Sequence, residues 1–174
     1  MFGAGNAIGV VLGGVFGHYS YRRDVRYPPV VMGIALILSS IPMWFLINTV
    51  DNETNAGTTA IIAVLTGVLA IVPVPIERAI LTNVSLPESR GRANSFLGMV
   101  DDLGKGLGPL FVSLLSGAVG RQTAFNASLL GWIIGGIISC FLFCTVKGDE
   151  ARVQELVRES IDRDGQTIME TGDN

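Results

Sequence analysis

Four long stretches without a charged side chain constrain this sequence more than any other feature. They cover residues 1–21, 28–50, 54–76 and 122–146. A helix needs about 20 consecutive apolar residues to span the hydrocarbon of a bilayer. Only helices and closed barrels can satisfy every backbone polar group in that environment. The four stretches therefore predict four membrane-spanning helices.

A fifth spanning helix is expected over residues 93–118, interrupted by Asp101, Asp102 and Lys105. An irregular loop could not cross hydrocarbon in its place. The prediction is an all-α fold, a polytopic membrane helix bundle of five transmembrane helices over residues 1–146. The helices are expected at about 3–20, 28–50, 56–76, 93–118 and 123–146.

The remaining residues, 147–174, contain four basic and eight acidic side chains. Asp149 is a suitable helix cap, and four apolar residues after it share one helical face. They are Val153, Leu156, Val157 and Ile161. We predict a tail with a short amphipathic helix at about 149–163, lying on the membrane surface or the bundle, or free in solvent. Residues 164–174 are expected to be disordered.

The basic residues are distributed unequally between the two sides of the predicted bundle. Ten lie on one side, and Arg121 alone lies on the other, with Lys105 inside a helix. The positive-inside rule then makes the ten-residue side and the C-terminus of this integral membrane protein cytoplasmic, and places Met1 outside. An N-terminus on the outside, without a signal sequence, is expected for the later part of a longer chain. The net charge of −3 arises in the tail and gives no indication of a nucleic-acid partner.

The charged trio in the fifth helix is the strongest candidate site. Asp101 and Lys105 are four residues apart and share a face, whereas Asp102 is rotated by about 100°. If the hydrocarbon begins near Ala93, Lys105 lies about 18 Å inside it. One lysine can neutralise only one carboxylate. The trio is either an ion cluster that holds helices together or a site where one carboxylate carries a proton.

Glu77 and Arg78 form a second candidate pair. They follow Pro73 and Pro75, which interrupt backbone hydrogen bonding near the inner end of the third helix. The pair could contribute to an inner gate, or could be an ordinary interfacial pair that reaches the lipid headgroups.

Two loops carry motifs. Residues 13–23 read G-G-V-F-G-H-Y-S-Y-R-R. This segment resembles the G-G-x-x-x-D-x-x-G-R-R loop of the major facilitator superfamily, with Gly14, Arg22 and Arg23 in place. His18 replaces the family's aspartate and Tyr21 replaces its glycine.

The second motif is N-V-S-L-P-E-S-R-G-R-A at residues 83–93, followed by G-K-G-L-G-P at residues 104–109. It is similar to the N-x-x-x-P-E-x-R-G-x-A loop before that superfamily's eleventh helix and to the G-x-x-x-G-P after it. The matching loop residues are Pro87, Glu88, Arg90 and Gly91.

The resemblance covers residues 1–146 and implies helices eight to twelve of a twelve-helix transporter, so a partial major-facilitator fold. It implies that 28–50 and 122–146 face lipid and that the spinster-like or general-substrate branch is the nearest. It implies a secondary transporter of a small solute that works by alternating access. The implied partners are the lipid bilayer, a small-molecule substrate (a lipid-like one is a candidate) and the missing N-terminal half. No cofactor and no metal are expected.

Glycines suggest where helices pack closely. Gly104 with Gly108, before Pro109, and Gly131 with Gly135 form small-xxx-small pairs. An enzyme is not expected, because the sequence has one histidine, no G-x-S-x-G and no metal-ligand cluster. A small membrane protein that assembles or packs without transporting is the alternative to a transporter.

Overall fold

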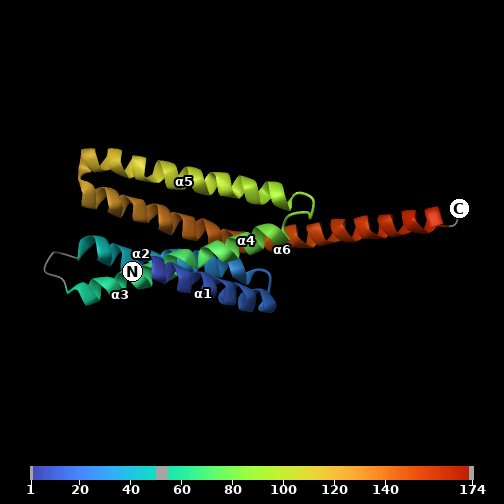
Figure 1. The fold of residues 1–174 in the computed structure, drawn as a ribbon, viewed down its shortest axis with the longest axis horizontal. Coiled ribbons are helices and arrows are strands. Elements are labelled where there is room, and N and C mark those ends of the chain that lie inside the picture. Colours follow the sequence, from blue (N-terminus) through green and yellow to red (C-terminus); the bar gives the residue numbers. More distant parts are fainter. Residues whose placement is uncertain (1, 50–54, 173–174) are drawn as a thin grey trace.

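The computed structural model describes residues 2–49 and 55–172, with side chains described for 3–49 and 55–163. Every regular element in this part is an α-helix, as predicted (Figure 1). The helices are α1 (Phe2–Arg23), α2 (Tyr27–Asn48), α3 (Ala56–Ile71), α4 (Pro73–Asn83), α5 (Arg90–Val119) and α6 (Arg121–Gly172).

The third predicted span is divided into α3 and α4 at Val72, directly before Pro73. Val72 keeps helical backbone angles, so the chain continues in the same direction through this interruption, which we call the α3–α4 junction. The proline ring removes a backbone donor and crowds the preceding turn, which explains the break. A buried cluster of Met32, Ala35, Val72 and Ile76 packs α2 against this junction.

Three segments of the described chain are long and apolar enough to cross a membrane: Tyr27–Asn48, Ala56–Asn83 and Arg121–Arg163. α1 and α5 have 22 and 30 residues, which is sufficient length, but they are not among these three. α1 is rich in glycine, and α5 contains the charged trio. Five membrane spans therefore stay a prediction.

The last helix differs from the sequence-based expectation. α6 runs without a break from Arg121 to Gly172, although a helix end near 146 and a disordered segment from 164 were predicted. The residues between 146 and 150 include no proline, and Lys147 and Glu150 are good helix formers. We call the part of α6 from Lys147 on the extension: Glu150 to Arg158 still border the loop 84–89, and the later part of the helix projects from the bundle (Figure 1). Residues 173–174 lie outside the described part.

The close helix crossings use glycines other than those predicted. Gly5, Gly9 and Gly13 follow one another at intervals of four along α1, and a Cβ atom at any of them would crowd the backbone of Val64, Val68 or Val72. α2 and α6 cross at Gly33 and Gly136, where a Cβ on Gly33 would lie 2.5 Å from the Gly136 carbonyl oxygen. Small residues allow such approach of two backbones.

The glycines named as packing residues in the sequence are in open space. Nothing lies within 4 Å of a Cβ built at Gly104, Gly108, Gly131 or Gly135. Pro109 lies inside α5, which has no buried residue. Within the described chain these positions therefore make no close helix contact, because Gly104 and Gly108 lie on an unpacked face of α5 and Gly131 and Gly135 lie on an unpacked face of α6.

The helix ends gather at two opposite ends of the bundle. The end of α1, the loop 84–89 and the part of α6 near Lys147 lie together (Figure 1). We call this the basic end, because Arg22, Arg23, Arg90 and Lys147 belong to it. The opposite end contains the end of α2 and the tight turn at Gly120, whose φ of 86° favours glycine.

Candidate functional site

The charged side chains predicted as a site come from two helices, α4 and α5. Glu77 and Arg78 lie in α4, about one turn after the α3–α4 junction, and the trio lies near the middle of α5. Glu77 interacts electrostatically with Asp101 and Arg78. Lys105 interacts with Asp101, Asp102 and Arg78. The structure thus brings the five predicted residues within electrostatic range of one another.

The ion pair expected from the four-residue spacing is present. Nζ of Lys105 lies 2.5 Å from Oδ2 of Asp101 and donates a hydrogen bond to it. Their side chains are 68% and 48% exposed, respectively, so they do not pack against other helices of this chain. The trio is therefore on a free side of α5.

The charges of the cluster do not balance. Glu77, Asp101 and Asp102 supply three carboxylates, and Arg78 and Lys105 supply two cations. Lys105 forms its ion pair with Asp101, so it neutralises the charge of Asp102 less completely. In a medium of low dielectric constant, the remaining negative charge needs a further cation, water or a proton.

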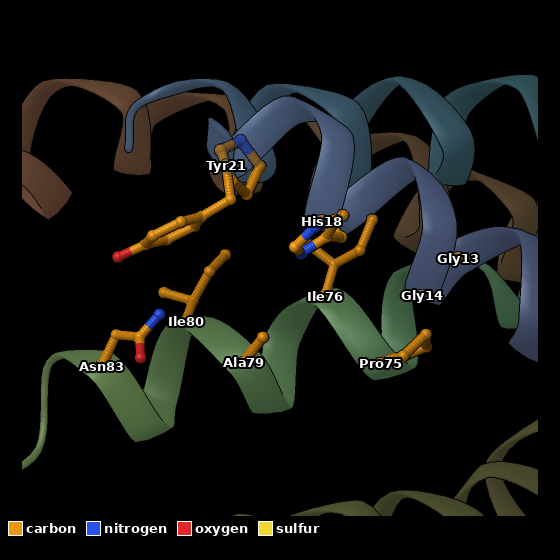
Figure 2. A pocket seen from close by; sticks show the side chains of 11 residues that line it. Gly13, Gly14, His18, Tyr21, Pro75, Ile76, Ala79, Ile80 and Asn83 are labelled. Atoms are coloured by element: carbon orange, nitrogen blue, oxygen red, sulfur yellow. The ribbon is translucent and has the colours of Figure 1, made fainter. Parts of the chain in front are cut away.

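The first loop motif borders a cavity of about 270 Å³ at the basic end, between α1 and α4. Figure 2 shows His18 and Tyr21 of α1 opposite Ile76, Ile80 and Asn83 of α4. The lining is largely apolar.

The arginines of this motif do not enter the cavity's lining. Arg23 donates a hydrogen bond to the Tyr19 hydroxyl at 2.7 Å, and its guanidinium lies 5.0 Å from the centre of that ring. Arg22 is exposed. Gly14 faces open space, whereas its neighbour Gly13 packs on the α3–α4 junction at Val72.

Arg90 of the second loop motif has a clear structural role. Its Nε donates to the carbonyl oxygens of Thr82 at 3.0 Å and Ser85 at 3.4 Å. The last carbonyls of a helix lack partners within the helix, and a cation there is favourable. Arg90 therefore closes the end of α4 and fixes the loop 84–89. Pro87 and Glu88 are exposed on that loop, and Gly91 faces open space.

Sequence reasoning missed Glu150, a carboxylate that is only 6% exposed. It follows Val146 by four residues and precedes Val153 by three, so it lies on the apolar face of α6. The spacing of Glu150 from Val146 and Val153 is the feature of the sequence that could have predicted its burial.

Apolar helices of membrane length, connected into one bundle, define a multi-pass integral membrane protein. A sequence profile described as the Major Facilitator Superfamily matches residues 1–164, and the chain belongs to this family. The family consists of membrane transporters and not of enzymes. Searches of the curated proteins and of the solved structures each gave no significant match.

Proposed function

We propose that this chain forms the C-terminal half of a secondary transporter, equivalent to helices eight to twelve. In this proposal α1 is the eighth helix, α2 the ninth, α3 with α4 the tenth, α5 the eleventh and α6 the twelfth. The family match and the two loop motifs, with two helices between them, support this order. The complete protein would move a small solute by alternating access.

The observation that carries the proposal is the charged, unpacked face of α5. This helix has no buried residue, yet Asp101, Asp102 and Lys105 lie in its middle. Charges in the hydrocarbon are costly and normally face a protein interior or a water-filled path. A second set of helices that covers this face would turn the trio into part of a central pathway.

The charge count suggests how the site works. The Asp101–Lys105 pair is neutral, so Asp102 is our candidate for the group that takes up and releases the coupling proton. Glu77 and Arg78 lie near the α3–α4 junction and within electrostatic range of the trio. In this proposal, a change in the protonation of Asp102 alters the electrostatic interactions of Glu77 and Arg78, and this change opens or closes an inner gate. A lipid-like solute and the spinster-like branch rest on the loop resemblance alone.

We also propose that the basic end is cytoplasmic. Ten of the twelve basic residues fall on one side of the predicted topology, and the helix ends and loops of the basic end gather together (Figure 1). Positively charged loops are retained on the cytoplasmic side. The membrane would then separate the start of α6 from its end, and the extension would lie in the cytoplasm.

Sequencing the transcript upstream of the codon for Met1 tests the proposed half. The expected result is an open reading frame in register that encodes seven further apolar segments of membrane length. An in-frame stop codon directly upstream would contradict the proposal and favour a small packing or assembly protein. The purified 174-residue chain should show no saturable uptake in proteoliposomes, and robust uptake by its monomer would also contradict the proposal.

A further inference from the structure

Glu150 is an unusual residue at the basic end because its carboxylate is buried without a complete set of partners. Oε1 accepts a hydrogen bond from Nε2 of Gln154 at 3.1 Å. Oε2 is also buried, and it has no hydrogen-bond partner of good geometry among the described residues. Burying such a group is unfavourable unless it is paired. The surroundings should therefore contain its partner.

The candidate hydrogen-bond donor to Glu150 is Tyr21, at the end of α1. Its hydroxyl is likewise buried without a well-aligned hydrogen bond, and it interacts electrostatically with Glu150 and with Asn83. Figure 2 shows the Tyr21 ring directed toward Asn83, at the end of α4. Burial, and then the Glu150 carboxylate, raise the pKa of Tyr21 above its ordinary value, so the hydroxyl is a donor at neutral pH.

A second arrangement is available to the carboxylate on its other side. Glu150 also lines a cavity of about 360 Å³ between the loop 84–89 and α6. Arg90 and Arg158 line the same cavity. Glu150 thus lies between a neutral donor on α1 and two guanidinium groups at the cavity, and it makes a complete hydrogen bond to neither in this conformation.

We propose that Tyr21 and Glu150 form a latch that fixes the extension of α6 to the end of α1. In the closed latch the Tyr21 hydroxyl donates to Oε2 of Glu150. In the open latch the carboxylate turns to Arg158 across the cavity, and the extension is released. The Glu150 carboxylate lacks a full set of hydrogen bonds. The closed and the open latch each supply a partner for it, so two discrete arrangements are favoured over a continuous range.

Hydrogen exchange of the full chain in lipid nanodiscs tests the latch without any transport assay, so its failure is separate from failure of the proposed function. Tyr21→Phe removes only the hydroxyl. We expect the amides of residues 149–163 to exchange about 2- to 10-fold faster, the effect of one lost hydrogen bond. Tyr19→Phe is the matched control, since Tyr19 is exposed and pairs with Arg23, and it should leave these amides unchanged.

Two further variants test the partners. In the Glu150→Gln background, Tyr21→Phe should cause little additional exchange, because the charged acceptor is already gone. Arg158→Gln should slow exchange of the extension by removing the competing partner. An equal effect of Tyr21→Phe in both backgrounds, or no effect beyond that of Tyr19→Phe, would overturn the latch. Unchanged or faster exchange in Arg158→Gln would overturn the open arrangement.

Discussion

Asn48 of α2 and Asn126 of α6 exchange hydrogen bonds in both directions. Nδ2 of Asn48 donates to Oδ1 of Asn126 at 2.8 Å, and Nδ2 of Asn126 donates to Oδ1 of Asn48 at 3.0 Å. Gln122 adds a third amide by donating to Oδ1 of Asn48 at 3.0 Å. These amides connect two helices that the family resemblance implied to face lipid.

The first prediction concerns this amide pair. Asn126→Leu should destabilise the protein, because it leaves the part-buried Asn48 amide without its main partner. The coupling between the two residues should be about 0.5–2 kcal/mol, the range for polar contacts between membrane helices. A double-mutant cycle with Asn48→Leu, followed by thermal unfolding in detergent, measures it. Purely additive effects would show that the pair contributes no coupling.

The second prediction concerns the glycine row of α1. Gly9→Ala should destabilise the protein by about 1–3 kcal/mol, because its Cβ would collide with Val68 and Ile71 of α3. Gly14→Ala is the matched control, since nothing lies within 4 Å of its Cβ position. It should be neutral or slightly stabilising in a helix. Equal melting temperatures for the two variants would contradict the observed crossing.

These features show which parts of the structure were accessible from the sequence. The uncharged runs predicted the helices, Pro73 and Pro75 predicted the interruption between α3 and α4, and the spacing of Asp101 and Lys105 predicted their ion pair. Each depends on local geometry, which the sequence specifies directly.

Features that depend on tertiary contact were not accessible in the same way. Both α1 and α5 contain glycines at intervals of four, and only the arrangement of the helices decides that Gly9 is packed and Gly104 is not. Asp149 could have capped a new helix, but it became an interior residue of α6, because no proline lies between 146 and 150 and Gly148 lowers helix propensity without ending the helix. The burial of Glu150 follows from that continuity.

The third prediction concerns topology. Thr58 and Glu88 are exposed and lie near opposite ends of the bundle. In a background without Cys140 and Cys144, a cysteine at Glu88 should react only with a reagent added to the cytoplasmic side. A cysteine at Thr58 should react only from the other side. The reverse pattern in intact and permeabilised cells would contradict the cytoplasmic assignment of the basic end.

The fourth prediction compares two charge changes in the trio. Lys105→Met removes the cation that Asp101 and Asp102 share, so two carboxylates lose their partner. It should reduce the yield of folded transporter. Asp102→Asn should preserve that yield, because Asn keeps the shape and the Asp101–Lys105 pair is unaffected. Size-exclusion chromatography of both full-length variants measures the difference, and an equal loss of folded protein would argue against the assigned pairing.

The role of Asp102 as the proton carrier is the central claim, and uptake by the full-length transporter against an imposed pH gradient tests it most directly. Wild type and Asp102→Asn are reconstituted at equal protein density, and uptake is followed across a range of pH gradients. The account predicts that wild-type uptake follows the gradient and that uptake by Asp102→Asn does not respond to it. An unchanged response to pH in Asp102→Asn would contradict the account and leave this carboxylate with a structural role.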